Sequence, residues 1–452
     1  MSTLEASNTG TKKLAASLLR RMIERPQQVL LREAFFQVHL WAGVLLALYV
    51  IAIGVSGSIL VFKEELMPKP RVRLGTVDYR ACTAAKLTQA IAAANTASPG
   101  MKAFLASCPT PANSMYTVMV RALPKRASGP PVQAALSGGL RGPKLPQRAV
   151  YLDPHTLAVL GDADREASWV ETVEQFHVNL LFGRGGRLWN GIGASVLLVI
   201  TLSGLVLWWP GIKNWTRGLK LDFRRSWKRI NFDLHSAMGI WTVFFTLTWA
   251  LTGMYFTWPK IFTTPMERLS HFQTANYPAK QLKEAQATLR QVGMPEGRVS
   301  GPVDDAAHPH ATPDRTEQPH SEAPVDVAGM IASAQRESPD GHLEGVFYGG
   351  GPKAIFTIYM ARGTLGDYSN TDFVYLDQRS GKLLYTWHRG QNHTLADWYV
   401  WLIAPLHFGT SFGQSFKVLW AVMGLALPAL TVTGLLMYWN RWLSRRLRRA
   451  IG

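Results

Sequence analysis

The sequence predicts an α-helical membrane protein, in which a four-helix transmembrane bundle arises from an internal duplication and two small α+β domains lie outside the membrane. Three observations indicate this fold: long apolar runs, basic residues gathered near one end of them, and motifs that recur in both halves of the chain. A helix of about 20 apolar residues crosses a bilayer core of about 30 Å. Four runs of at least that length contain no Asp, Glu, Lys or Arg, namely 34–62, 188–212, 234–259 and 418–440.

The apolar runs predict the positions of the four membrane helices. We expect the first to be a retained helix over 34–62, because it begins too far along the chain and is too long for an ordinary cleaved signal peptide. The third run predicts a helix over 234–259. The second and fourth helices belong to segments 176–209 and 393–440, each of which begins with an interfacial stretch.

Basic residues predict the orientation of these helices. They concentrate in the tail 1–33, the loop 210–233 and the tail 441–452, which all lie on one side of a four-helix topology. Because short loops rich in Lys and Arg face the cytoplasm, both termini are expected there, with the four helices in membrane lipid. The net charge of +18 is then largely a topology signal. No fold that reads nucleic-acid grooves is visible, so nucleic acid is not an expected partner.

The two long connections, 63–175 and 260–392, are expected outside the cytoplasm as one small α+β domain each. Both connections contain a helical stretch followed by strands, and the turn at 377–381 reads as a hairpin. The helical stretches are AAKLTQAIAAAN (84–95) and VAGMIASAQRE (327–337), and the strands end in AVYLDPHTLAVLG (149–161) and FVYLDQRSGKLLYTW (373–387).

Cysteines and two inserts distinguish the periplasmic segments. Cys82 and Cys108 form a plausible disulfide pair outside the cytoplasm, whereas two thiols alone make a poor metal site. The insert 124–147 is rich in Pro, Gly and basic residues. The insert 294–325 has few apolar residues and reads as a solvated linker. Metal binding is the alternative for its histidines, His308, His310 and His320.

Histidines and glycines recur at the same offsets in the two halves. HLWAG begins at His39 and HSAMG at His235, and Gly57 and Gly253 follow these histidines by eighteen residues, which is five helical turns. In the other two helices, FHVNLLFG contains His177 and LHFGTSFG contains His407. Gly204 and Gly434 follow these two histidines by 27 residues. Agreement at so many offsets predicts an internal duplication.

The repeated histidines predict two haem sites. His39 and His235 begin helices on the cytoplasmic side, whereas His177 and His407 precede helices that start at the opposite face. Two opposed imidazoles give six-coordinate haem iron suited to electron transfer, and glycines on facing helices allow a porphyrin to approach the backbone. No CxxCH motif is present, so two non-covalent b-type haems are expected. Buried histidines bonded between helices are the alternative, and His388 and His393 are alternatives to His407.

The sequence contains no sign of a built-in electron source. We find no phosphate-binding loop and no convincing G-x-G-x-x-G after a strand, and GRGG (183–186) is too weak a match to a nucleotide motif. Electrons are therefore expected from another molecule.

The HLWAG and HSAMG openings, the LHFG before the last helix and the YLD-turn-strand segments together resemble the PepSY-associated transmembrane family over nearly the whole chain. The resemblance implies two PepSY-like periplasmic domains and similarity to dihaem siderophore reductases of the inner membrane. It implies a haem-dependent ferric-siderophore reductase for iron uptake, with His39 and His235 on the inner haem and His177 and His407 on the outer haem. No acid, base or nucleophile is needed for such transfer, so no catalytic residue is expected.

Two other hypotheses fit the sequence. One is a non-enzymatic membrane protein whose periplasmic domains bind a peptide or a protease, with structural histidines. The other keeps the haems, with a quinol instead of a cytoplasmic reductase as electron donor, or a different periplasmic acceptor in place of ferric siderophore.

Overall fold

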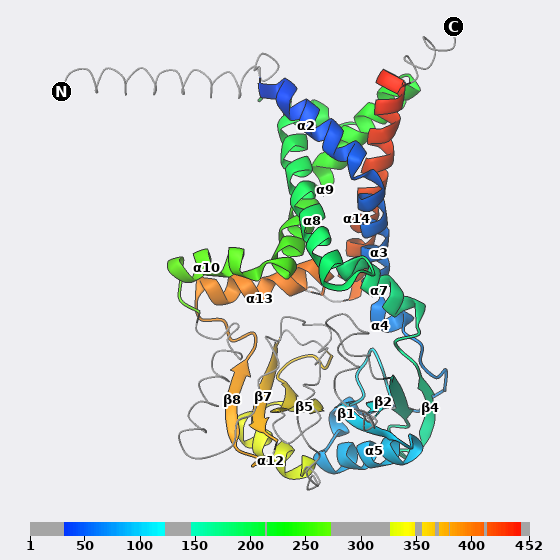
Figure 1. The fold of residues 1–452 in the computed structure, drawn as a ribbon, viewed down its shortest axis with the longest axis vertical. Helices are drawn as coiled ribbons and strands as arrows, with labels where there is room; N and C mark the ends of the chain where they lie inside the picture. Colours follow the sequence, from blue (N-terminus) through cyan, green and yellow to red (C-terminus); the bar gives the residue numbers. More distant parts are fainter. Residues whose placement is uncertain are drawn as a thin grey trace, which may run out of the picture. The chain divides into compact units, whose positions relative to one another are not determined.

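The structure, a computed structural model, describes residues 31–122, 146–212, 215–272, 326–348, 355–366, 370–378, 380–410 and 414–443. The insert 294–325 with its three histidines, nearly all of the insert 124–147, and most of both basic tails lie outside the described residues. The chain divides into a helical unit, formed by 1–62, 173–262 and 406–452, and a sheet unit formed by 63–172 and 263–405. Figure 1 shows the elements of each unit.

Long apolar helices make up the helical unit. Three of them, α8 (Gly183–Trp208), α9 (Trp227–Thr257) and α14 (Gln414–Tyr438), are long and apolar enough to cross a membrane. The remaining candidate span is a pair, α2 (Leu31–Leu45) and α3 (Ala47–Leu60). The structure therefore has the four expected spans if α2 and α3 together cross the membrane as one span.

The first apolar run differs from the single helix expected over 34–62. It breaks at Leu46, and α2 and α3 meet at an angle of 66°. Tertiary packing explains the break, because α2 packs on α8 whereas α3 packs on α14. Gly54 permits the second contact, since a Cβ at this position would lie 3.1 Å from the Cβ of Leu427 and 3.2 Å from the carbonyl oxygen of Gly424.

The two units also contain shorter helices and helical turns. They are α4 (Lys63–Leu66), α7 (Trp169–Asn179), α10 (Pro259–Leu269), α13 (Leu395–Phe408), the 3₁₀ turns η2 (Tyr79–Ala81) and η3 (Trp215–Leu219), and the π turn η5 (Trp439–Leu443).

One antiparallel sheet of eight strands organises the sheet unit, in the order β4-β3-β2-β1-β5-β6-β7-β8. The first half contributes β1 (Met101–Ser107), β2 (Tyr116–Ala122), β3 (Gln147–Leu152) and β4 (Val159–Ala163). The second half contributes β5 (His342–Tyr348), β6 (Ile355–Ala361), β7 (Thr371–Asp377) and β8 (Leu383–His388).

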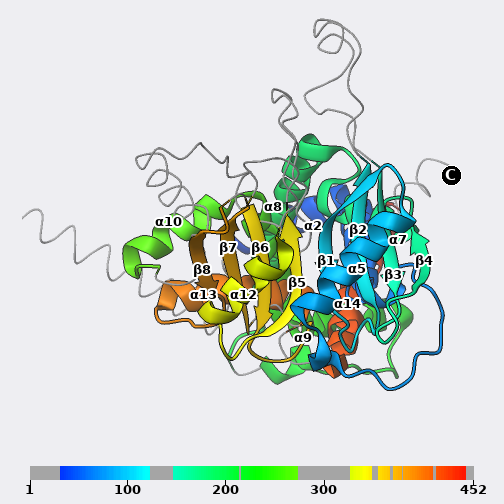
Figure 2. The ribbon, with the colours of Figure 1, turned by 90° about the horizontal axis from the view of Figure 1, so that it is seen from below.

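The two halves of the sheet unit do not form the separate small domains that we expected. Strands β1 and β5 pair antiparallel, so that Leu105 lies opposite Phe347 and Ser107 opposite Gly345. This pairing satisfies backbone groups that two independent sheets would each expose at an edge. The result is one continuous sheet, with α5 (Ala84–Ala97) and α12 (Val327–Glu337) on the same face (Figure 2).

The core of the sheet unit lies between this face and the two helices. Alternate strand residues such as Val118, Val150 and Ile358 are fully buried there or nearly so, and they pack with Leu87 of α5 and Ile331 of α12. The structure also joins Cys82 and Cys108 in a disulfide, in agreement with the pairing considered from the sequence.

Candidate functional site

The helical unit brings the four predicted histidines together as two pairs. His39 of α2 faces His235 of α9, with ring centroids 6.2 Å apart and ring planes at 84°. His177 of α7 faces His407 of α13, with centroids 6.3 Å apart and planes at 58°. These are the partners that the repeated motifs predict.

The structure places the two alternative histidines elsewhere. His388 ends β8 in the sheet unit, where its Nδ1 lies 3.0 Å from a carboxylate oxygen of the buried Asp372. The backbone N–H of His393 donates to Asp397 at the start of α13. It is therefore His407 that faces His177.

A hydroxyl side chain contacts each histidine of the first pair at Nδ1. The Nδ1 of His39 lies 3.2 Å from Ser203 Oγ and 2.9 Å from the carbonyl oxygen of Ile200, both on α8. The Nδ1 of His235 lies 2.9 Å from Thr433 Oγ1 on α14.

The second pair repeats this arrangement on the other two helices. The Nδ1 of His177 lies 3.0 Å from Ser56 Oγ on α3. The Nδ1 of His407 lies 2.7 Å from Thr252 Oγ1 on α9. All four hydroxyl residues are buried, with Ser203 only 1% exposed.

The hydroxyl groups also set the tautomer of each histidine. Each donates its hydrogen to a carbonyl of its own helix, one turn earlier: Ser56 to Ile53, Ser203 to Ile200, Thr252 to Thr248, and Thr433 to Ala429 or Leu430. The oxygen is then left to accept, so Nδ1 of the imidazole is the donor. The lone pair of each ring consequently resides on Nε2. Second-shell bonds of this kind orient histidines that ligate metals.

The predicted glycines lie beside the histidines in three of four cases. A Cβ at Gly57 would lie 2.9 Å from Cε1 of His177, and one at Gly204 would lie 2.9 Å from Cε1 of His39. A Cβ at Gly434 would lie 3.3 Å from Cε1 of His235. These glycines make room for the imidazole rings themselves.

Gly253 departs from this pattern. A Cβ there would lie 3.3 Å from the Cβ of Ala194, so Gly253 serves the packing of α9 against α8. The sequence offsets alone placed it level with the second histidine pair. Its neighbour Thr252 makes the contact with His407 instead.

Sequence reasoning missed the four hydroxyl residues, although a signal for them was present. Each stands directly before one of the predicted glycines, in the dipeptides Ser56-Gly57, Ser203-Gly204, Thr252-Gly253 and Thr433-Gly434. Three of these glycines leave space for an imidazole ring, and the hydroxyl group before each glycine forms a hydrogen bond with a histidine Nδ1.

The spacing of the pairs fits a metal held between two imidazoles. An imidazole nitrogen binds a metal at about 2.0 Å and the ring centre lies about 1.1 Å behind it, so opposed ligands have centroids about 6.3 Å apart. The two observed separations agree with this value. Within the described ranges, no cluster of three or more His, Cys, Asp or Glu is suited to a metal ion.

Further hydrogen bonds hold the backbone of the second pair. Asn190 Nδ2 donates to the carbonyl oxygen of His177 at 2.7 Å, and Trp420 Nε1 donates to that of His407 at 3.2 Å. Tyr49 in turn donates to Asn190 Oδ1 at 2.7 Å. Both histidine-bearing segments are thus anchored to long helices through their main chain.

Apolar helices of membrane-spanning length define a helical membrane protein, and within its helical unit four histidines face each other as two pairs. The family model described as PepSY-associated TM region matches residues 36–441, and the chain belongs to this family. A comparison with curated proteins found no match.

Proposed function

We propose that this protein is an inner-membrane oxidoreductase that holds two b-type haems and passes electrons across the membrane to a ferric siderophore, or another ferric chelate, in the periplasm. The observation that supports this most is the pair of facing imidazole sites, each with Nδ1 bonded to a buried hydroxyl. Axial ligation of haem iron by two histidines requires one free imidazole nitrogen on each ring, and a bond at Nδ1 leaves Nε2 for this purpose.

Each residue of the two sites has a distinct role in the proposal. His39 and His235 would hold the inner haem, and His177 and His407 the outer haem. The four hydroxyl residues keep the imidazoles in the Nε2-ligating tautomer, and Gly57, Gly204 and Gly434 leave space for the rings. Bound haem supplies reversible one-electron transfer without proton chemistry at the protein.

The proposed reaction needs no acid or base from the chain. One electron from a cytoplasmic reductase or a quinol reduces Fe(III) in the chelate to Fe(II), which is then released because such chelates prefer the harder ferric ion. The protein therefore contributes position, insulation from water and a periplasmic surface for the chelate. In the proposed topology, with both termini in the cytoplasm, His177 and His407 would lie near that surface.

The deciding experiment is an absorption spectrum of the detergent-purified protein, oxidised and then dithionite-reduced, with haem quantified per chain. We expect two b-type haems, one haem fewer in both His39→Ala and His177→Ala, and no loss in the control His388→Ala. Rapid reoxidation of the reduced protein by a ferric hydroxamate would identify the acceptor class. A colourless protein from haem-replete cells would instead favour a non-enzymatic binding role, and reduced haems that ignore ferric chelates would favour a different acceptor.

A further inference from the structure

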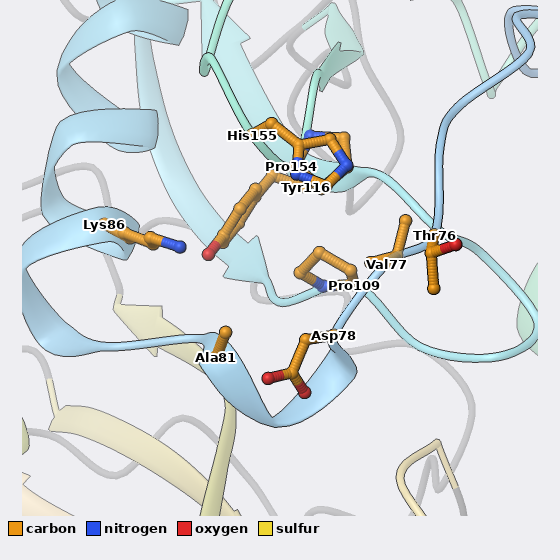
Figure 3. Close-up of a pocket in the computed structure, with 9 residues that line it drawn as sticks. All are labelled: Thr76, Val77, Asp78, Ala81, Lys86, Pro109, Tyr116, Pro154 and His155. Atoms are coloured by element: carbon orange, nitrogen blue, oxygen red, sulfur yellow. The ribbon is translucent and has the colours of Figure 1, made fainter.

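The sheet unit contains a small polar cavity that electron transfer does not use. Its volume is about 110 Å³, and it lies between the start of α5, the start of β2 and the turn at Pro154 and His155 (Figure 3). This volume is large enough for a carboxylate group with a few attached atoms. Neither a porphyrin nor a whole ferric chelate would fit.

A buried tyrosine points into this cavity. Tyr116 is 1% exposed and its ring belongs to the core beneath α5. Among the described residues its hydroxyl has no hydrogen-bond partner, and Figure 3 shows the hydroxyl directed toward the ammonium group of Lys86. Burial raises the pKa of Tyr116, so the hydroxyl remains a donor at neutral pH.

Lys86 is the second donor, and its position is unfavourable for helix stability. It is half-buried in the first turn of α5, where its backbone N–H donates to the N-capping Thr83. A cation at a helix N-terminus opposes the helix dipole by about 0.3–1 kcal/mol. Within the described part of the chain Lys86 has no ion pair. An anion in the cavity would offset this unfavourable interaction, since it would meet both the ammonium group and the positive end of α5.

The disulfide makes the cavity rigid before any ligand arrives. Ala81 and Pro109 both line the cavity, and they directly adjoin Cys82 and Cys108, whose Cα atoms the disulfide holds 6.0 Å apart. A preformed site loses little entropy on binding. Asp78 also lines the cavity, where one carboxylate oxygen accepts the backbone N–H of Arg80. This negative charge repels a doubly charged anion such as phosphate more strongly than a singly charged carboxylate.

We propose that this cavity binds a single carboxylate group, which forms an ion pair with Lys86 Nζ and accepts a hydrogen bond from Tyr116. A free small acid and the C-terminus of a peptide both present this group. The proposal is independent of haem binding, because all of its residues belong to the sheet unit.

Ligand-detected NMR on the full-length protein in detergent tests the proposal with acetate, tri-alanine, amidated tri-alanine and inorganic phosphate as probes. We expect saturable binding of acetate, of tri-alanine or of both, and none of amidated tri-alanine or phosphate. Saturation by tri-alanine alone would identify a peptide terminus as the source, and saturation by acetate a small acid. Lys86→Met should abolish binding, and Tyr116→Phe should weaken it about tenfold, the effect of one hydrogen bond to a charged group.

The control Lys102→Met removes an exposed lysine of β1 outside the cavity and should bind as the wild type does. Thermal unfolding and the absorption spectrum of each variant establish that it is folded. The proposal is overturned if no carboxylate saturates the protein, if phosphate binds more tightly than the carboxylates, or if Lys86→Met and Tyr116→Phe both bind normally while folded.

Discussion

Replacing Thr252 by valine removes one hydroxyl and leaves the shape of the side chain almost unchanged. In the structure, Thr252 Oγ1 lies 2.7 Å from Nδ1 of His407 and is the hydrogen-bond partner of that nitrogen among the described residues. Valine cannot accept this bond, so the Nδ1–H of His407 would be left buried without an acceptor. The ring would then be free to rotate or to change tautomer.

The size of the effect follows from the contact that is lost. A buried donor without a partner costs about 1–3 kcal/mol, and 1.4 kcal/mol corresponds to a factor of ten in affinity. The outer haem should therefore bind about 5-fold to 150-fold more weakly, in agreement with the 10-fold to 100-fold effects of second-shell substitutions in other metal sites.

The assay is the transfer of haem from the purified, oxidised protein to excess apomyoglobin. Thr252→Val should release one of two haems faster than the wild type, and the other at the wild-type rate. The matched control is Thr242→Val, which deletes a buried hydroxyl of the same helix whose hydrogen bond, among the residues that the structure describes, goes to the carbonyl of Met238. Unchanged haem content, spectrum and release in Thr252→Val would refute the orienting role of the hydroxyl.

Further predictions concern other contacts of the two histidine pairs, the disulfide and two buried tyrosines. Ser203→Ala should weaken the inner haem less than Thr252→Val weakens the outer one, because His39 Nδ1 also lies 2.9 Å from the carbonyl oxygen of Ile200. Gly57→Ala should disturb the spectrum of the outer haem, since its Cβ would lie 2.9 Å from the ring of His177; Gly253→Ala is the control, and equal spectra would contradict the argument. Replacing both cysteines by serine should lower the free energy of unfolding of the sheet unit by about 3.5 kcal/mol, because the disulfide closes a loop with a sequence separation of 26 residues. Denaturant unfolding measures this loss. Burial raises the pKa of Tyr348 to about 12 and also raises that of Tyr359, so both stay neutral in the fold. The stability that these neutral tyrosines contribute to the fold should be complete below a pH of about 10 and lost as the pH rises toward 12. In the folded protein, tyrosinate absorbance should therefore appear at a higher pH than it does for free tyrosine. Its appearance at the ordinary pKa would contradict this prediction.

The sequence by itself predicted most of what depends on local composition and spacing. Apolar length predicts the membrane helices, and fixed offsets between motifs predict which histidines face each other. The helices of the sheet unit also begin close to where the sequence places them, at Ala84 and Val327. These features are readable because hydrophobic length and helical periodicity belong to contiguous segments. The internal duplication and the haems remain predictions.

Only the tertiary structure decided which elements contact one another. The break at Leu46 follows from packing on two different helices, and the single eight-stranded sheet follows from the pairing of β1 with β5. The partner of each histidine Nδ1 and the separate role of Gly253 likewise depend on how the helices pack. Spacing along a chain indicates which residues share one face of a helix. Packing between segments far apart in sequence determines which residues contact that face. The histidines were therefore visible in the sequence, whereas the hydroxyls that orient them became visible only once the helices were assembled.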